Sequence, residues 1–390
     1  MKERNAIFII DILKNIINVY FDTFFVFYFF RLANYEVLPL AKYYISLYLF
    51  VGIGFFLIRK KMKNNFKVPI FRIGISLQAL YISFIMILKE NIVHYIVFIG
   101  ILKGIADGFY FYPKNILDTE KISNQDRQKY SGTVNVINNI VSIAIPFILG
   151  VALTFFSYVS LGKIFFLLFI VMFIISFYLK DTYYQEDTFN VRKFFSVFHK
   201  NRNIKFALSE PLLSGITFSS GVMEVIVTLS KIHNFKTNLN LGFVDSICAF
   251  SSLIICVLFA LKIKKEQFPK IMKISGIIGF IVLLLFAIYP TQSQLIIYLL
   301  VRYSFITSIN LISNYVVTNF SNSKELGHDL KTEFYCMRDI LFSVSRCFGF
   351  LVLLLVCILL GMEYIHYIMI LPAISILIES IIIGRLCKKC

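Results

Sequence analysis

Tryptophan is absent from this chain of 390 residues, and histidine occurs only five times. The histidines fall in predicted loops or near the ends of predicted helices, at His94, His199, His233, His328 and His366. The sequence has no HExxH, GxSxG or GxxxxGKS/T motif and no cluster of acidic metal ligands. These absences argue against a membrane enzyme and an ATP-driven pump, so we predict that the chain is not an enzyme and uses no cofactor.

Cysteine is also scarce, with seven residues, most of which lie inside apolar stretches. This placement does not predict an extracellular disulfide framework. Cys387 and Cys390 form a lone CxxC at the end of the chain, and one such pair does not complete a tetrahedral metal site. We therefore predict no metal centre.

Long hydrophobic runs are what the sequence has in abundance, and 58% of its residues are hydrophobic. About 20 helical residues cross the roughly 30 Å hydrocarbon core of a bilayer. Barrel strands would need about ten residues of alternating polarity, a pattern that is missing here. The sequence predicts an all-α polytopic membrane protein with twelve transmembrane helices, at residues 5–30, 37–58, 68–88, 92–113, 132–155, 164–179, 206–229, 241–261, 271–289, 295–317, 335–360 and 365–383.

The formal net charge of +17 would suggest nucleic acid as a partner of a soluble protein. Here the basic residues gather in alternate loops, as the positive-inside rule describes. The loops on the other side hold few, among them Arg31, Lys89, Lys231 and Lys236. This asymmetry predicts a multi-pass protein of the cell membrane with both termini in the cytoplasm, and it predicts no nucleic-acid partner.

A long polar segment in the middle of the chain predicts how it is divided. We expect an N-terminal six-helix half at residues 1–180, a cytoplasmic linker at 181–205 and a C-terminal six-helix half at 206–390. Lys103 and Arg302 lie 199 residues apart at similar predicted depths, which is a faint sign of a repeat. Parallel six-helix halves are one of the repeat schemes of transporters.

Polar side chains mark the first, fourth, seventh and tenth predicted helices, whereas the third, sixth, ninth and twelfth are almost purely apolar in their middles. Ionisable residues at membrane depth are costly and indicate function by default. We predict a proton-coupling group in the cavity, made of Asp22, Lys103, Asp107, Glu224 and Arg302. We predict that the polar lining of a substrate cavity is made of Asn15, Asn18, Asn135, Asn139, Thr217, Asn310 and Asn314. A hydrogen-bonded bundle interior is the alternative explanation of these stripes.

Depth and spacing divide the five charged residues into roles. Lys103 and Asp107 are one turn apart and are expected to pair within one helix. Asp22, Glu224 and Arg302 fall in the outer half of their helices, where two desolvated acids would favour binding of a proton. We therefore expect Asp22 or Glu224 to carry the proton and Arg302 to tune it.

The chain resembles the major facilitator superfamily. Its loop after the second helix has Gly54 followed by Arg59, Lys60 and Lys61, but Ile58 stands where that family usually has an aspartate of its cytoplasmic gate. The segment from Lys103 to Asn115 and the run from Ser345 to Gly349 resemble a poorly characterised branch from Gram-positive bacteria. The resemblance implies twelve helices and alternating access, and it implies no settled substrate.

These observations predict a secondary active transporter that moves a small solute across the cytoplasmic membrane, by proton-coupled efflux. The expected partners are the small-molecule substrate, protons and membrane lipid, and the expected state is a monomer. Proton-coupled uptake of a small metabolite is the alternative within the class. A non-transporting membrane receptor or immunity protein is the alternative outside it.

Overall fold

A computed structural model describes residues 2–62, 66–121, 124–181, 189–231, 238–321, 326 and 330–387. Some side chains inside helices also lie outside the described set, notably those of Asp22 and Asn135. Every regular element among the described residues is helical, which confirms the predicted fold class. Nine stretches of this described part are long and apolar enough to cross a membrane. One of them, Lys67–Asp118, contains two successive helices and the short 3-10 segment that connects them.

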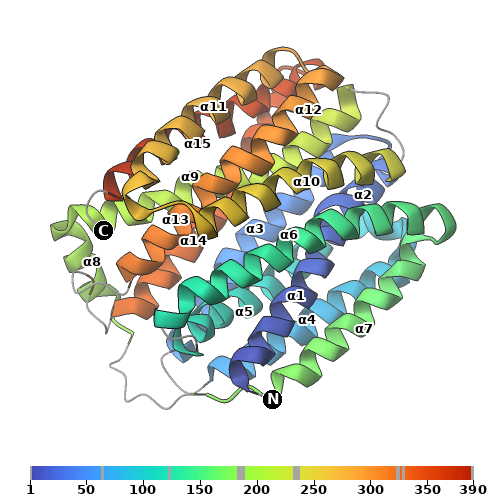
Figure 1. Ribbon diagram of the computed structural model, residues 1–390. Helices are drawn as coiled ribbons and strands as arrows, with labels where there is room; N and C mark the ends of the chain where they lie inside the picture. Colours follow the sequence, from blue (N-terminus) through green and yellow to red (C-terminus); the bar gives the residue numbers. More distant parts are fainter. Residues whose placement is uncertain are drawn as a thin grey trace.

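The helices form twelve rods along the described chain (Figure 1). In the N-terminal half they are α1 (Glu3–Val19) continued by η1 (Tyr20–Phe25) and α2 (Val26–Leu32), then α3 (Val37–Ile58), α4 (Lys67–Leu88), α5 (Ile96–Lys121), α6 (Asn124–Phe155) and α7 (Tyr158–Ser176). In the C-terminal half they are α9 (Arg202–Lys231), α10 (Asn238–Leu261), α11 (Phe268–Ile288), α12 (Gln292–Val301) continued by η6 (Arg302–Ile306) and α13 (Thr307–Ser321), then α14 (Lys331–Leu359) and η8 (Met362–Met369) continued by α15 (Ile370–Leu386).

Capping residues in the sequence set several of these boundaries. The Ser157 side chain accepts a hydrogen bond from the Ser160 N–H at 3.1 Å and begins α7. Thr291 does the same for α12 by accepting from the Gln294 N–H at 3.3 Å. Such side chains satisfy amide groups that the first turn of a helix leaves without intrahelical partners. A helix can therefore begin sharply at the edge of an apolar run.

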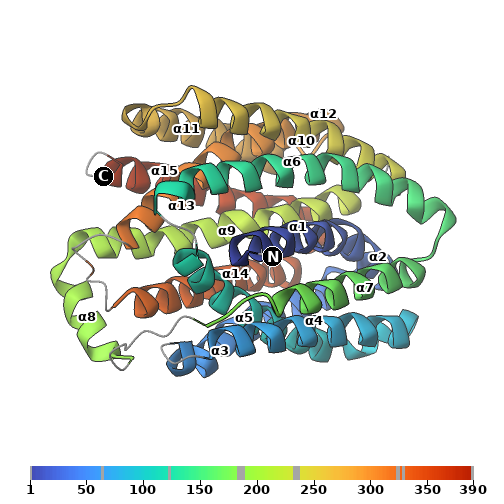
Figure 2. The same cartoon turned by 60° about the horizontal axis from the view of Figure 1, so that its bottom comes forward.

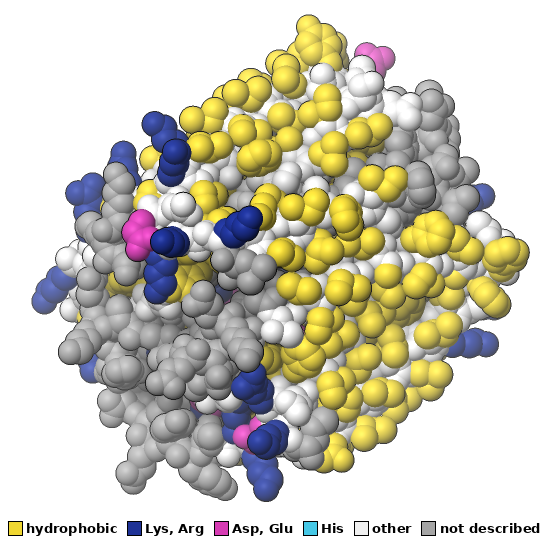
Figure 3. All heavy atoms as spheres, viewed as in Figure 1, with side chains coloured by type: hydrophobic (Ala, Val, Ile, Leu, Met, Phe, Trp, Pro, Cys, Tyr) yellow, Lys and Arg dark blue, Asp and Glu magenta, His cyan; other side chains and the backbone are white. Residues whose placement is uncertain are grey.

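Both chain ends lie at the same end of the bundle (Figures 1 and 2). On the face drawn in Figure 3, most Lys and Arg side chains gather at this end, and hydrophobic side chains cover the adjoining wall. We call it the basic end; it holds residues 2–4, residues 59–62, the short helix α8 (Val191–Lys200) and residues 385–387. The distribution is that of a protein with one strongly basic rim beside an apolar belt.

Small residues bring α5 close to α3. Gly108 faces Gly54 so closely that an added Cβ would lie 3.0 Å from the Gly54 Cα. Gly104 abuts the Leu47 carbonyl, and Gly100 abuts Ser46. The spacing of Gly100, Gly104 and Gly108, four residues apart, thus serves close backbone packing. Between the two halves, α3 packs on α14 and α6 packs on α10, with further contacts of α5 with α14 and of α2 with α9.

Besides the earlier starts of α6 and α7, three features differ from the sequence prediction. First, α5 continues past Pro113 to Lys121, because the proline removes only one helical donor while the ion pair of Lys114 with Asp118 supports the next turn. Second, the segment predicted as a linker contains α8, whose first amides are capped by Asn190. Third, the first and tenth rods each contain a π-helical segment, η1 and η6.

Candidate functional site

The N-terminal half holds a buried charge cluster around Asp107. Lys103 donates to one Asp107 oxygen from the same helix, and Gln78 of α4 donates to the other at 2.8 Å. Lys14 of α1 donates to Gln78 at 3.1 Å and lies 3.9 Å from Asp107. The side chains of Lys14, Lys103 and Asp107 are only 5–10% exposed. One carboxylate therefore holds two ammonium groups and ties three helices together.

Aromatic rings complete this cluster. Lys14 lies 5.1 Å from the centre of the Tyr110 ring, and Lys103 lies 5.7 Å from the centre of the Tyr81 ring. The faces of such rings attract cations, which offsets part of the cost of burying two ammonium groups beside one carboxylate. The charged groups of this cluster therefore have polar or aromatic partners on α1, α4 and α5.

The C-terminal half arranges its central charges differently. Arg302 forms an ion pair with Glu224, so the pair joins η6 to α9. Arg302 is also the first residue of the π-helical segment η6. The Glu224 side chain is 7% exposed, whereas that of Arg302 is 30% exposed. A π-helical turn widens the helix locally and is frequent at functional sites.

Gly221 leaves space for this ion pair. Gly221 lies one turn before Glu224 on α9, and a Cβ at Gly221 would collide with the guanidinium of Arg302. The missing side chain is therefore part of the site, because it lets the cation lie flat against α9. Asp22 lies in the other π-helical segment, η1, which contacts α9. Its side chain is outside the described set.

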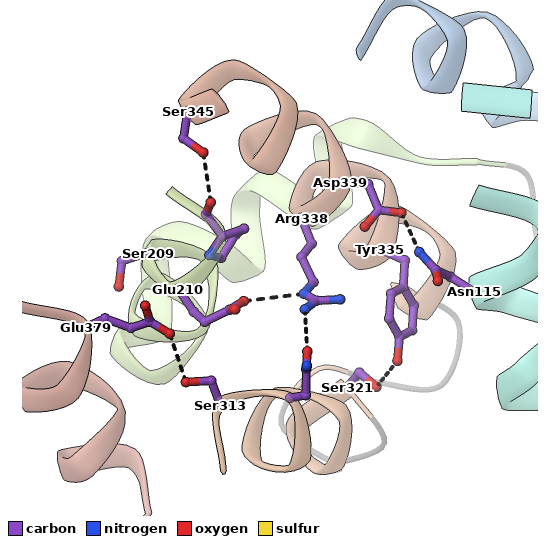
Figure 4. A network of polar contacts seen from close by, with 12 residues as sticks. Asn115, Ser209, Glu210, Ser313, Ser321, Tyr335, Arg338, Asp339, Ser345 and Glu379 are labelled. Atoms are coloured by element: carbon purple, nitrogen blue, oxygen red, sulfur yellow. Dashed lines mark hydrogen bonds and ion pairs between the residues drawn. The ribbon is translucent and has the colours of Figure 1, made fainter. Parts of the chain in front are cut away.

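A second C-terminal network lies nearer the basic end (Figure 4). Arg338 of α14 lies 3.4 Å from Glu210 of α9 and donates to the Asn314 amide oxygen at 3.1 Å. Ser313 of α13 donates to Glu379 of α15 at 2.9 Å. This network ties four helices of the C-terminal half.

Polar contacts between the halves lie beside this network. Asn115 of α5 donates to Asp339 of α14 at 3.0 Å, and the Tyr112 hydroxyl donates to the Thr332 carbonyl at 3.2 Å. Both bonds join the basic ends of α5 and α14. They close one side of the junction between the halves with directional contacts that a relative movement of the halves would break.

The structure gives the predicted polar lining several different environments. Asn139 donates to the Cys256 sulfur at 3.0 Å and accepts from Ser252 at 2.8 Å, so it joins α6 to α10. Asn15 donates to the Asn138 carbonyl at 3.2 Å. Thr217 is buried and donates to its own helix at Leu213. These contacts are what a hydrogen-bonded bundle interior would show.

The remaining predicted lining residues lie in more open places. Asn310 and Asn314 are both exposed, and the contact of Asn314 with Arg338 turns this face of α13 toward α14. Asn18 is partly buried in α1. The Asn135 side chain lies outside the described set.

Sequence reasoning passed over several members of these clusters. Gln78 is the one amide of its predicted helix and Glu379 the one acid of its predicted helix, so neither belongs to a stripe of such residues. Lys14 lies beside the polar stripe of its helix, and Arg338 and Asp339 lie near the start of α14. Each is nevertheless an ionisable or amide group inside an apolar run, which is a usable signal by itself.

Arg346 occupies the middle of α14 at the junction of the halves. Its guanidinium lies 3.9 Å from the ring centres of both Phe218 and Phe342, and 5.1 Å from that of Tyr48. These rings come from α9, α14 and α3 respectively. Next to it, Tyr44 of α3 stacks on Phe350 of α14 with ring centres 4.5 Å apart. The halves therefore meet here through aromatic rings around one cation.

An all-α bundle with charged groups paired inside its apolar rods has the architecture of a polytopic membrane protein. The family model described as Major Facilitator Superfamily matches residues 39–330. The chain belongs to the major facilitator superfamily. Among curated proteins, it is 22% identical over 334 residues to the uncharacterized protein YqgE of Bacillus subtilis (strain 168), covering 83% of this chain and 76% of that protein.

Solved structures show the same fold at low sequence identity. A human organic anion transporter matches with a TM-score of 0.67 and 12% identity, covering 98% of this chain and all of that one, 100%. A bacterial homologue of the iron transporter ferroportin, in an outward-facing state, matches with a TM-score of 0.67 and 13% identity over 99% of both chains. The fucose:proton symporter of E. coli matches with a TM-score of 0.65 and 11% identity, covering 98% of this chain and 97% of that one.

Proposed function

We propose that this protein is a secondary active transporter that exports a small solute across the cell membrane in exchange for protons. The observation that carries the proposal is the ion pair of Glu224 with Arg302, which is largely buried and joins two helices at a π-helical turn. A purely structural ion pair gains little from burial, since desolvation cancels much of the attraction. An ion pair whose attraction is nearly cancelled by desolvation can separate at low cost during a transport cycle.

Proton coupling follows from the chemistry of this pair. When a proton binds Glu224, the carboxylate loses its charge and its hold on Arg302. The guanidinium, already 30% exposed, is then available to an anionic group or to water. Asp22, in the π-helical segment η1 that contacts α9, is the second proposed proton carrier. Lys103 and Asp107 belong to the proposed coupling group as its fixed, buried part.

The polar residues of the lining have a smaller role in the proposal. Asn310 and Asn314 lie on an exposed face of α13, and Asn18 is partly buried in α1, so these are the positions we assign to the solute pathway. Asn15, Asn139 and Thr217 are hydrogen-bonded within the bundle and would shape that pathway indirectly. Asn135 is assigned by sequence alone.

Alternating access would move the six-helix half of residues 1–180 against that of residues 206–390, with residues 181–205 as the linker. The aromatic contacts around Arg346 and the bond of Asn115 with Asp339 lie where these halves meet. We place both termini and the basic end in the cytoplasm, because cytoplasmic loops carry the excess of Lys and Arg. The working form is a monomer.

Reconstitution into liposomes tests the proposal. The purified chain would be screened by thermal shift against metabolites and amphipathic dyes such as ethidium, and the hits would be followed in proteoliposomes under an imposed pH gradient. The proposal predicts solute movement against the proton gradient, lost in Glu224→Gln and retained in Glu363→Gln, whose acid is exposed in η8. Solute movement together with protons would favour uptake instead, and hits that bind without moving would favour a receptor.

A further inference from the structure

Glu379 is a carboxyl group placed where a charge is hardest to hold. It lies on α15, has no exposed surface (0%), and is flanked on its face by the buried Ile376, Ser380 and Ile383. Its Oε1 atom accepts a hydrogen bond from Ser313 at 2.9 Å. Its Oε2 atom is buried and has no hydrogen-bond partner among the described residues. An ionised carboxylate in such a place costs several kcal/mol unless a cation compensates it.

The neighbouring segments offer few charges to compensate it. The segments α9, α11, α13 and η8 pack against α15. From α9 the charged group that faces Glu379 is another acid, Glu210, which is 3% exposed (Figure 4). From α13 it meets the hydroxyl of Ser313.

The remaining charges lie away from Glu379: Arg202 and Lys205 of α9 and Arg385 of α15 are exposed, and Glu224 is paired with Arg302. Lys270 and Lys273 of α11 are exposed. In η8, His366 and Glu363 precede Glu379 by 13 and 16 residues, which places them roughly 20 Å away along the rod.

The one guanidinium of the network is already engaged. Arg338 lies 3.4 Å from Glu210 and donates to Asn314 at 3.1 Å. The adjacent acid, Asp339, is held by Asn115 of the other half. Glu210 and Glu379 thus lie in one network, and its guanidinium is bound to Glu210.

We propose that Glu379 is a proton-binding residue, neutral while Arg338 is bound to Glu210. When Arg338 turns from Glu210 toward Glu379, the carboxyl group transfers its proton to water and remains as a carboxylate paired with the guanidinium. Glu210, left without its cation, then takes up a proton in turn. The inference rests on the proposed function, because such an exchange matters only if the helices move.

Glu379 would be part of a second proton-binding site, at another depth of the membrane than Glu224. Glu210 and Glu224 are 14 residues apart on α9, which corresponds to about 21 Å along the helix. Glu224 lies toward the end opposite the basic end, and the network of Glu379 lies toward the basic end. Proton-binding groups at two depths would give protons one site toward each surface of the membrane.

Infrared spectroscopy of the purified full-length chain tests proton binding without a solute. At neutral pH, the spectrum should contain the C=O band of a protonated carboxyl group that shifts in heavy water. The band should be lost in Glu379→Gln and kept in Glu363→Gln. In Ser313→Ala the band should remain but change frequency, since the hydrogen bond to Oε1 is gone. A band that is unchanged in both Glu379→Gln and Ser313→Ala would overturn the proposal.

Two further measurements separate the other outcomes. Glu379→Asp keeps a titratable group and should keep a protonated band, so an unfolded Glu379→Gln variant would not end the test. Thermal unfolding in sodium and in choline chloride at one pH should coincide; stabilisation by sodium that Glu379→Gln abolishes would make this a metal-cation site and contradict the inference. If the band behaves as expected but no pH-driven transport is found, the proposed function fails and the proton site stands.

Discussion

The two halves of the molecule place a cation at corresponding points of the chain, yet they hold it in opposite ways. Lys103 is paired with Asp107 of its own helix, and two more side chains, Gln78 and Lys14, enclose the same acid. Arg302 is paired with Glu224 of a different helix and is 30% exposed. Lys103 and Asp107 therefore move together on one helix, whereas the C-terminal pair changes whenever α9 shifts against η6.

The comparison assigns different work to the two halves. A carboxylate surrounded by donors inside a packed cluster stabilises a scaffold. A carboxylate whose cation comes from another helix and is partly exposed can exchange that partner at a smaller cost. We therefore regard the N-terminal cluster as the fixed element of the coupling group and the C-terminal pair as the element that responds to protons.

The largest expected effect is that of Asp107→Asn. It would leave Lys14 and Lys103 buried without a carboxylate, and losing one partner of a buried charge cluster costs about 3–5 kcal/mol. Unfolding of the purified protein in mixed detergent micelles would measure the loss. Glu90→Gln is the matched control. Because Glu90 is exposed, this substitution should change stability by less than about 0.5 kcal/mol. A loss no greater than that of Glu224→Gln would remove the distinction between the halves.

Gly104→Ala should have the next largest effect. The new methyl group would press on the Leu47 carbonyl and the backbone of α3, which do not give way easily. Overpacking of this kind costs about 1–3 kcal/mol. Gly52→Ala is the control, since its nearest neighbour would be the Ser343 Cβ at 3.6 Å, an ordinary contact. Equal effects of the two substitutions in the same unfolding assay would show that α3 and α5 are not held this closely.

The apolar pattern of the sequence predicted the helices well where their ends are marked by charge. The bounds of α3 agree with the prediction at both ends, because Glu36 and Arg59 flank one continuous apolar run. The end of α5 was missed, because Pro113 and the polar residues after it look like a loop although Lys114 and Asp118 support another turn.

Helical spacing predicted one of the two central ion pairs directly. The pair of Lys103 with Asp107 follows from one-turn spacing. That of Arg302 with Glu224 depends on how α9 packs on η6, which the order of residues does not encode locally. Gln78 and Glu379 could not be found from periodicity, because each is the one amide or acid of a mostly apolar helix. The π-helical segments left no mark in the sequence pattern.

A double-mutant cycle on Glu224 and Arg302 measures the C-terminal pair itself. Because Arg302 is 30% exposed, we expect a coupling energy of only about 1 kcal/mol from Glu224→Gln, Arg302→Gln and the double variant. The readout is again unfolding in micelles. The same cycle with Glu363 in place of Glu224 should give no coupling. A coupling as large as the loss in Asp107→Asn would mean that both pairs are equally fixed.

Gly221→Ala should have the smallest effect on stability. The added methyl group meets the far end of the Arg302 side chain, which can move aside, so the loss should stay below about 0.5 kcal/mol. Its displacement should nevertheless weaken the coupling between Arg302 and Glu224 in the double-mutant cycle. Unchanged coupling in the Gly221→Ala background would show that the guanidinium does not need this space.

The most direct test of the account compares two kinds of transport in Glu224→Gln proteoliposomes. One experiment drives the solute with an imposed pH gradient, and the other follows exchange of labelled for unlabelled solute without a gradient. If Glu224 couples protons to solute, the variant loses at least about tenfold of the gradient-driven rate, equivalent to 1.4 kcal/mol, and keeps exchange. Gradient-driven transport that continues at the rate of the unsubstituted protein would contradict the central claim that the C-terminal pair is the proton-responsive element.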